Sequence, residues 1–232
     1  MEKVTTILFV RHGQTEWNAN GRWQGHADVP LNETGRTQAA ALAQRLAAQT
    51  EWQIDALVAS DLARASETAV IIGNAIGHTP IFTPQWRERD MGGFSGLTRP
   101  EILVKFPGLL EDEHSGFGLT PPNGEGGDAF WDRGKQAVNG VVAQHTGKTV
   151  LVVSHGGLLY ATVARLLGMG QEHFGNLRFG NTSLSVMLID DHHARLHLLN
   201  DMNHLKEPDL TGFENLSDLA EAYERQLSRL NK

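Results

Sequence analysis

Three short apolar runs, rich in β-branched residues, constrain the fold of this chain more than any other feature. They cover residues 5–10, 56–59 and 149–153. Nearly continuous apolar runs of this length are typical of strands that are buried on both faces, as in parallel sheets covered by helices. The sequence therefore predicts an α/β protein with parallel strands.

Amphipathic segments lie between and after these runs. Ala39, Leu42 and Leu46 repeat at helical spacing, and Asn32 is placed to cap that helix. The other predicted elements are helices at residues 61–76, 129–144 and 158–167, a short strand at 80–84, and a hairpin of strands at 182–190 and 194–200. Together they predict a three-layer αβα sandwich whose central sheet is mostly parallel, with an antiparallel edge strand.

The segment of about 92–127 interrupts this alternation. It is rich in Gly and Pro and has no long periodic element, which indicates either a functional insertion or a surface loop. We interpret it as a flap inserted over the C-terminal rim of the sheet. Residues of about 214–231 have helical spacing, and we interpret this C-terminal extension as a packing or oligomer element of a single domain, 1–232.

The composition excludes several classes of function. The formal net charge of −7 at pH 7 argues against nonspecific binding to nucleic acids and anionic membranes, which attract basic surfaces. The chain has no cysteine, so disulfides and cysteine-ligated metal sites are excluded. Its N-terminus passes directly into an apolar strand, unlike a secretory signal, and no apolar run is long enough to cross a bilayer. We therefore expect a cytoplasmic protein.

Four basic residues follow the predicted parallel strands. Arg11 and His12 come at the end of the first strand, Arg64 lies just inside the helix after the second, and His155 follows the 149–153 strand. Each has an ordinary explanation alone, such as a solvated helix residue for Arg64 or a buried structural residue for His155. Because the carboxyl ends of parallel strands share one rim, the four together predict a cation cluster for a phosphoryl group.

Either histidine of this cluster suits nucleophilic attack on phosphorus. A histidine with an ordinary pKa of about 6.5 is largely neutral at pH 7 and needs no separate base. Side-chain chemistry alone does not distinguish His12 from His155. Gly13, beside His12, would permit close backbone approach to a phosphate.

At these residues the chain resembles the histidine phosphatase superfamily, also called the phosphoglycerate-mutase-like family. "RHGQTEWN" is similar to the family's signature, and "GHADVPLNETGRTQA", "SDLARASETA", "RERDMGGFSG", "PPNGEG" and "VVSHGG" follow in the family's order. The resemblance covers about residues 7–205. An ordered set of motifs is far more specific than any one of them.

The resemblance implies a role for each matching residue. His12 would be the nucleophile that becomes phosphohistidine, and Glu88 would be the proton donor and acceptor. The residues that would bind the substrate are Arg11, Asn18, Gln24, Gly25, Arg64, Arg89, His155 and Gly156. Ser95 departs from the family pattern, because an acidic residue often stands there, and this weakens assignment to a subfamily more than it weakens activity.

The resemblance also implies that no metal is required, since arginines and a histidine would replace the divalent cation of many phosphoryl-transfer sites. A phosphatase and a phosphoglycerate mutase then differ in whether water or a second alcohol attacks phosphohistidine. A mutase, which would need 2,3-bisphosphoglycerate as a priming cofactor, must bind a second anion. Between residues 97 and 128 the only Arg or Lys residues are Arg99 and Lys105, against six acidic ones, which opposes a polyanionic substrate.

Other observations keep alternatives open. Arg22, Arg87 and Arg89 surround the catalytic motifs and could bind a distal anion. We nevertheless favour a phosphatase that acts on a small phosphate monoester over a mutase. An inactive phospholigand-binding module is a third alternative. The chain could also form a homo-oligomer. A metal site at His193 and His197 is disfavoured, because their helix-like spacing has no meaning in a predicted hairpin.

Overall fold

The computed structural model describes residues 3–108, 120–173 and 175–206, and within them six strands form one sheet in the order β3-β2-β4-β1-β5-β6. The strands are β1 (Thr5–Arg11), β2 (Ala56–Ala59), β3 (Ile81–Phe82), β4 (Thr149–Ser154), β5 (Leu184–Ile189) and β6 (Ala194–Asp201). The helices are α1 (Glu16–Ala19), α2 (Glu33–Ala48), α3 (Ala63–Ile76), α4 (Arg99–Lys105), α5 (Gly127–Gln144) and α6 (Gly156–Leu166).

The sheet is mixed, with a parallel centre. β1 pairs with β4, β4 with β2, and β2 with β3, all in parallel. β5 runs antiparallel to β1, and β6 returns antiparallel to β5 at the edge. The predicted α/β sandwich, with its parallel strands and edge hairpin, is confirmed.

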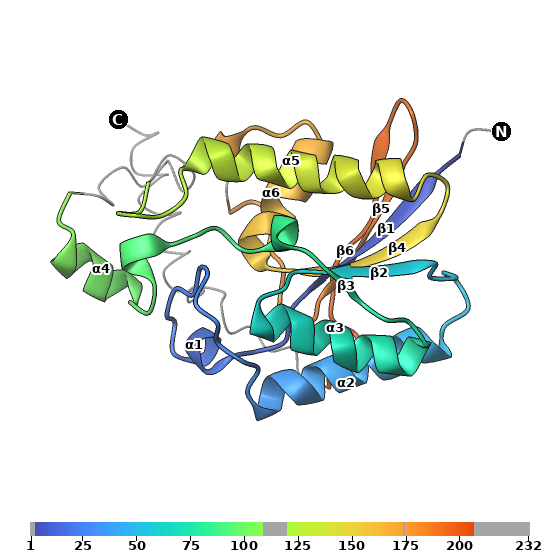
Figure 1. Ribbon diagram of the computed structural model, residues 1–232, viewed down its shortest axis with the longest axis horizontal. Helices are drawn as coiled ribbons and strands as arrows, with labels where there is room; N and C mark the ends of the chain where they lie inside the picture. The colour runs from blue at the N-terminus through green and yellow to red at the C-terminus, as the bar shows by residue number, and fades with distance from the viewer. Residues whose placement is uncertain (1–2, 109–119, 174, 207–232) are drawn as a thin grey trace, which may run out of the picture.

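Helices cover both faces of the sheet, with α2 and α3 on one side and α5 and α6 on the other (Figure 1). Successive residues of β1 therefore enter different cores: Ile7 and Phe9 pack toward α5 and α6, and Leu8 and Val10 pack toward α2 and α3. All four are fully buried, and each such side chain contributes about 2 kcal/mol of transfer free energy. Two covered faces explain why this strand shows no polar alternation.

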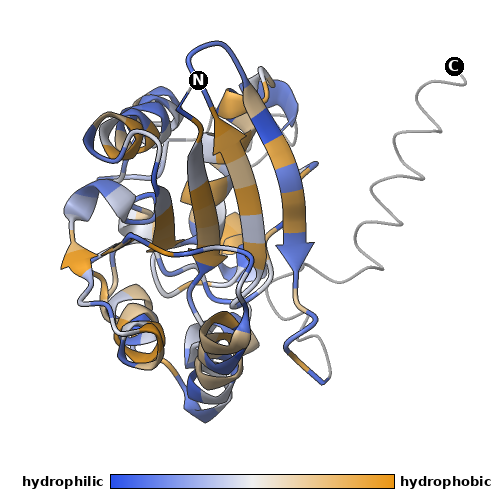
Figure 2. Cartoon of the chain, turned by 90° about the vertical axis from the view of Figure 1, so that its right-hand side faces the viewer, coloured by the Kyte–Doolittle hydropathy of each residue, from blue (hydrophilic) through white to orange (hydrophobic). Residues whose placement is uncertain are grey.

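The edge hairpin has a different pattern, because only part of it is covered. β5 is almost wholly buried, whereas residues of β6 alternate between exposed and partly buried over its first half. In the hydropathy colours of Figure 2, hydrophilic residues interrupt the edge strand along its length. This alternation is that of a strand with one face against the protein and one in water.

The helix boundaries lie within two residues of those expected for α3, α5 and α6. α2 begins as its cap predicts, with the side chain of Asn32 accepting a hydrogen bond from Gly35 N–H over 2.8 Å. α6 starts at Gly156, two residues before the predicted start, because His155 has the extended backbone of an N-cap. The first N–H groups of α6 therefore face the rim of the sheet.

The segment expected to be a flap contains a short helix and a small core in its described part. α4 begins with a capping box formed by Thr98 and Glu101. Met91, Phe94 and Ile102 are buried together. Residues 109–119 of the segment, and the C-terminal helix expected at about 214–231, lie outside the described residues. Within the described residues, no helix is both long and apolar enough to cross a membrane.

Candidate active site

The structure brings the four predicted basic residues together at the rim of the sheet. Arg11 is the last residue of β1, Arg64 lies in the first turn of α3, and His155 caps α6. The rings of His12 and His155 lie 5.1 Å apart between centroids. The side chains are 8% exposed for Arg11, 3% for His12, 1% for Arg64 and 0% for His155, so the cluster is buried.

One nitrogen of His12 is engaged with the backbone. Nδ1 lies 2.7 Å from the carbonyl oxygen of Gly13, and because a carbonyl only accepts, Nδ1 carries the proton. Burial, followed by the positive charges of Arg64 and Arg11, lowers the pKa of His12 well below its usual value. The ring is thus neutral with its lone pair on Nε2, which is the form needed to attack phosphorus.

Gly13 packs closely against the start of α2. A Cβ at this position would lie 2.5 Å from the carbonyl oxygen of Gly35, so the absence of a side chain allows close approach to the start of α2. Gly13 permits the packing that holds the loop after His12. The expectation that Gly13 also permits backbone approach to a phosphate stays a prediction.

Arg64 is a buried guanidinium, so its interpretation as a solvated helix residue is wrong. Its two terminal nitrogens donate to the carbonyl oxygens of Ala27 and Gly25 over 2.9 and 2.8 Å. Nε is buried and has no hydrogen-bond partner among the described residues. Burial lowers the pKa of Arg64 to about 10, which leaves the side chain charged at pH 7. A buried cation with a remaining donor suits an anionic ligand.

Arg11 is held against the start of α6. Its Nη1 donates to the carbonyl oxygen of Phe179 over 2.7 Å. A Cβ on Gly156 would lie 3.5 Å from Arg11 Nε, which shows how closely the two approach. The predicted substrate-binding residues Arg11 and Gly156 are therefore neighbours.

His155 contacts a residue that the sequence analysis did not single out. Its Nε2 lies 2.8 Å from the hydroxyl oxygen of Ser60, which follows β2. Its Nδ1 is buried with no hydrogen-bond partner among the described residues. Burial is the main cause that lowers the pKa of His155 well below its usual value, and Arg64 is the next. His155 is therefore a neutral ring at pH 7.

Glu88 lies at the N-terminus of α6. Its Oε1 accepts the backbone N–H of Arg89, and its Oε2 accepts the backbone N–H of Gly157, each over 2.9 Å. Each oxygen keeps a second lone pair on which a proton can reside. Arg87, which could have paired with Glu88, instead forms two hydrogen bonds of 2.7 and 2.6 Å with Asp61. Glu88 is therefore oriented toward the cluster by backbone groups.

The remaining predicted substrate-binding residues have mixed placements. The carbonyl of Gly25 supports Arg64, and Gln24 is buried with an Oε1 that has no partner among the described residues. Asn18 caps its own short helix, with Oδ1 accepting from Thr15, so only its Nδ2–H groups remain as donors toward a substrate. Arg89 is 6% exposed, and its Nε donates to the carbonyl oxygen of Glu125.

A buried polar loop before β5 also supports His12 and was not predicted. The side-chain amide of Asn181 donates to the carbonyl oxygen of His12 over 2.9 Å. The N–H of Thr182 donates to the carbonyl oxygen of Arg11 over 3.0 Å. Thr182 has φ of 56°, which is strained for a β-branched residue. The polar run "GNTS" directly before an apolar strand was the available signal.

The histidines of the hairpin do not form the helical pair that their spacing resembles. His193 lies in the turn near Asp190, and His197 lies on β6 near Glu51. Within the described part of the chain, no group of three or more potential metal ligands gathers.

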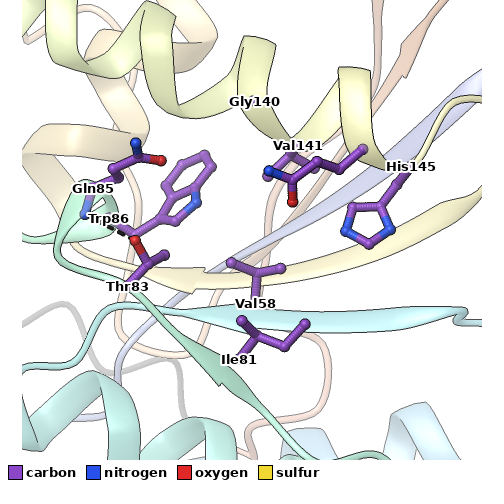
Figure 3. A pocket seen from close by; sticks show the side chains of 9 residues that line it. Val58, Ile81, Thr83, Gln85, Trp86, Gly140, Val141 and His145 are labelled. Carbon is purple, nitrogen blue, oxygen red and sulfur yellow. Dashed lines mark hydrogen bonds between the residues drawn. The ribbon is translucent and has the colours of Figure 1, made fainter.

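A separate cavity of about 220 Å³ lies between β3, the turn that follows it and α5 (Figure 3). Val58, Ile81, Trp86 and Val141 are among its lining residues, and none of the five predicted catalytic residues is. The candidate site is instead the buried cluster of Arg11, His12, Arg64 and His155 at the rim.

An α/β fold with two arginines and two neutral histidines at the carboxyl edge of its sheet defines a phosphoryl-transfer enzyme. Residues 7–202 match the family model described as the histidine phosphatase superfamily (branch 1), and the chain belongs to this family as a phosphatase or mutase.

Comparison with curated proteins finds relatives of both kinds. The chain is 36% identical over 216 residues to phosphoglycerate mutase-like protein 4 of Arabidopsis thaliana, covering 89% of this chain and 88% of that protein. It is 35% identical over 210 residues to a metal-independent phosphoserine phosphatase of the same plant, covering 88% and 84%. Mycobacterial glucosyl-3-phosphoglycerate phosphatase has a similar structure, with a TM-score of 0.75, 31% identity, and coverage of 85% of this chain and 99% of that one.

Proposed function

We propose that this chain is a metal-independent phosphomonoester hydrolase that acts on a small phosphorylated metabolite through a phosphohistidine at His12. The buried neutral ring of His12, with Nδ1 engaged by Gly13, supports Nε2 as the nucleophile. Arg11, Arg64 and His155 then meet the charge on the transferring phosphoryl oxygens. These groups lie in a buried cluster, where such charge stabilisation is strongest.

The reaction has two displacements. In the first, His12 Nε2 forms a bond to phosphorus, the bond from phosphorus to the ester oxygen breaks, and Glu88 gives its proton to the departing alkoxide. In the second, water forms a bond to phosphorus and the P–N bond breaks. The Glu88 carboxylate takes the proton of that water. The net change converts a phosphomonoester and water into an alcohol and inorganic phosphate.

The observation that favours hydrolysis over phosphoglycerate mutation is the pairing of the arginines that could have bound a second anion. Arg22 donates to the carboxylate of Glu101 over 2.9 Å. Arg87 is paired with Asp61 by two hydrogen bonds. Carboxylates therefore meet the charge of both guanidinium groups, which weakens the attraction of either arginine for a second anion such as that of 2,3-bisphosphoglycerate.

Arg89, the third arginine near the motifs, is also engaged inside the protein. It is buried, and its Nε donates to the backbone of Glu125 over 3.0 Å. Burial lowers its pKa, with Glu125 acting in the opposite direction. The side chain therefore joins two segments of the protein, which supports a substrate with a single phosphate.

Relatives suggest the substrate class. The phosphoserine phosphatase and the glucosyl-3-phosphoglycerate phosphatase are named for small metabolites that carry one phosphate ester. We propose the same class for this chain. The mutase relatives keep transfer to a second alcohol as the alternative. An inactive phospholigand-binding module is a further alternative.

A substrate panel tests the proposal. Phosphate release would be measured from phosphoserine, glucosyl-3-phosphoglycerate and sugar phosphates, beside the interconversion of 2- and 3-phosphoglycerate with and without 2,3-bisphosphoglycerate. We expect release from at least one monoester, undiminished by a chelator and absent in His12→Ala. Isomer transfer faster than any release would favour the mutase, and binding without turnover would favour the inactive module.

A further inference from the structure

We propose that Arg133 of α5, locked in place by Glu125, is a positioning residue that sets the location of the Glu88 carboxylate. This inference rests on the proposed function, because it needs Glu88 to be the proton donor. Arg133 lies outside all the motifs that carry the family resemblance. Its importance comes only from the contacts that the fold gives it.

Arg133 donates hydrogen bonds to several carbonyl groups of the segment that contains Glu88. Its Nη1 donates to the carbonyl oxygens of Gln85 and Arg87 over 3.1 and 2.7 Å. Its Nη2 donates to the carbonyl oxygen of Glu88 over 3.0 Å. One rigid guanidinium therefore fixes three carbonyl groups within four consecutive residues, and the last belongs to the proton donor itself.

Glu125 holds Arg133 in the orientation that these contacts require. The Nε and Nη2 of Arg133 donate to the two carboxylate oxygens of Glu125 over 2.8 and 2.7 Å. The pair is largely buried, with side chains 20% and 18% exposed. A bidentate pair of this kind fixes the plane of the guanidinium as well as its position.

Glu125 also holds the chain on the other side of Glu88. Its carboxylate accepts the N–H of Asp90 over 3.3 Å, and its own N–H donates to the carbonyl oxygen of Asp90 over 2.9 Å. Its backbone carbonyl accepts from Arg89 Nε. Arg133 and Glu125 thus bracket Glu88 from both directions along the chain.

The segment needs such support, because little regular structure holds it. Between β3 and α4 it contains only single 3-10 turns, at Pro84–Trp86 and Gly92–Phe94. Glu88 must nevertheless meet Gly157 closely, since a Cβ on Gly157 would lie 2.5 Å from Glu88 Oε1. A displacement of about 1 Å at a reacting group can cost about a hundredfold in rate.

His26 provides a comparison within the same segment. Its Nε2 lies 2.8 Å from the carbonyl oxygen of Glu88, so it is a second donor to the group that Arg133 Nη2 also contacts. It donates to one carbonyl group of this segment, and its Nδ1 lies 3.8 Å from the carboxylate of Asp90, whereas Arg133 donates to three carbonyl groups. We therefore expect the arginine to have the larger effect on Glu88.

The experiment must distinguish an electrostatic effect of the Arg133 charge from the effect of its hydrogen-bond geometry. Burial is the main cause that lowers the pKa of His155, and the charge of Arg133 is the last of several further causes. Arg133→Lys keeps the charge and loses the planar fork, whereas Arg133→Ala loses both. If geometry matters, the lysine variant should behave like the alanine variant.

The experiment uses the leaving group to report on the proton donor. A proton donor matters greatly for a poor alkoxide leaving group and much less for an activated phenolate. The value of kcat/KM would be measured with an alkyl phosphate and with p-nitrophenyl phosphate for the wild type, Arg133→Ala, Arg133→Lys, Glu125→Gln and Glu88→Gln. Arg165→Ala is the matched control, because this arginine is also partly buried and pairs with Asp132 of α5.

We expect Arg133→Ala and Arg133→Lys to lose about thirtyfold to a hundredfold on the alkyl phosphate and less than about fivefold on p-nitrophenyl phosphate. Glu125→Gln, which keeps the side-chain volume, should give the same pattern to a smaller degree. If Arg133→Ala does not fold, Glu125→Gln is the variant that tests the proposal. In the Glu88→Gln background, Arg133→Lys should add less than about threefold. Arg165→Ala should leave the ratio of the two substrates unchanged.

The outcomes separate this inference from the proposed function. If Glu88→Gln shows the leaving-group effect but the Arg133 and Glu125 variants lose equally on both substrates, the positioning role is wrong and general-acid catalysis stands. Additive losses in the double variant would also overturn the positioning role. If Glu88→Gln itself has no leaving-group effect, the proposed proton donor is wrong and the inference falls with it.

Discussion

His12 donates its Nδ1–H to the carbonyl oxygen of its own neighbour, Gly13, over 2.7 Å. The contact requires no residue distant in sequence, yet it determines the tautomer of the ring. Asn181 reinforces it from the far side by donating to the carbonyl oxygen of His12. The backbone that follows the imidazole is therefore fixed, and Nε2 is the ring nitrogen that carries no proton.

A covalent intermediate on His12 is the first prediction. Brief reaction with a radiolabelled phosphomonoester should label His12 with an acid-labile, base-stable phosphoryl group, because a P–N bond forms in the first displacement. Quenching followed by peptide mapping would locate the label. His12→Ala should not be labelled, and His155→Ala should still be labelled, only more slowly. A phosphoryl label on His155 would mean that His155, and not His12, is the nucleophile.

The fold could be predicted because its strands are buried on both faces. Ile7, Leu8, Phe9 and Val10 are all apolar since α5 and α6 cover one face of β1 and α2 and α3 cover the other. The same topology places the ends of β1, β2 and β4 side by side. This is why residues spread from position 11 to position 155 could be assigned to one site from sequence.

The supports of the site could not be predicted, because they act through single hydrogen bonds with no periodic pattern. Asn181 resembles any polar residue near a turn until the fold brings it to His12. The motif that begins with Ser60 does not show that its hydroxyl reaches His155. The pairing of the arginines around the motifs could not be predicted for the same reason. Arg22 counts as an available cation in the sequence, but its partner Glu101 lies 79 residues away.

Arg64 carries the second prediction. Arg64→Ala should slow phosphoryl transfer by about a thousandfold or more, equivalent to roughly 4 kcal/mol, which is the scale of an arginine acting on this transition state. Single-turnover kinetics with p-nitrophenyl phosphate would measure it. Arg195→Ala is the control, because Arg195 is 59% exposed and pairs with Asp190 on the edge hairpin. A loss smaller than about tenfold would leave Arg64 as a support for the Gly25 turn only.

Ser60 carries the third prediction, because its hydroxyl is the hydrogen-bond partner of the His155 ring. The N–H of Leu62 donates to Ser60 Oγ over 3.3 Å, so the hydroxyl can direct its own proton to His155 Nε2. His155 then carries its proton on Nδ1, the buried donor that has no partner among the described residues. Ser60→Ala should lower kcat/KM about tenfold, the equivalent of one hydrogen bond of about 1.4 kcal/mol.

The control for Ser60→Ala is a substitution of Ser66, which lies six residues further along the chain. Ser66 is in α3, and its hydroxyl donates to the carbonyl oxygen of Ala63. Ser66→Ala removes a hydroxyl of the same size without touching His155, so kcat/KM should be unchanged. Equal effects of the two substitutions would assign the loss at Ser60 to packing.

The last prediction is that two buried histidines, His12 and His155, and the partly buried His204 make the folded state sensitive to mild acid. Burial lowers the pKa of His12 and His155 well below the usual value, and it lowers the pKa of His204 to about 4. Below about pH 6.5 the unfolded chain binds protons at these positions that the folded chain does not, so stability falls as the pH falls. Each such group removes up to about 1.4 kcal/mol of unfolding free energy per pH unit.

His204 allows this to be measured without disturbing the candidate catalytic residues. Its Nε2 lies 2.9 Å from the hydroxyl of Thr182, and His204→Gln keeps a polar group there. Urea unfolding at about pH 7.5 and about pH 5 should show that the variant loses about 2 kcal/mol less than the wild type on acidification. Asp61 and Asp201 do not affect this difference in stability between about pH 7.5 and about pH 5. Their pKa values in the folded protein are lowered from 3.8, so the stability that their ionised carboxylates provide is lost only at a lower pH. His193→Gln is the matched control, since its side chain is 73% exposed and stays hydrated in both states. An identical loss of stability in His204→Gln and the wild type would mean that His204 takes up its proton in the folded protein as readily as in the unfolded chain.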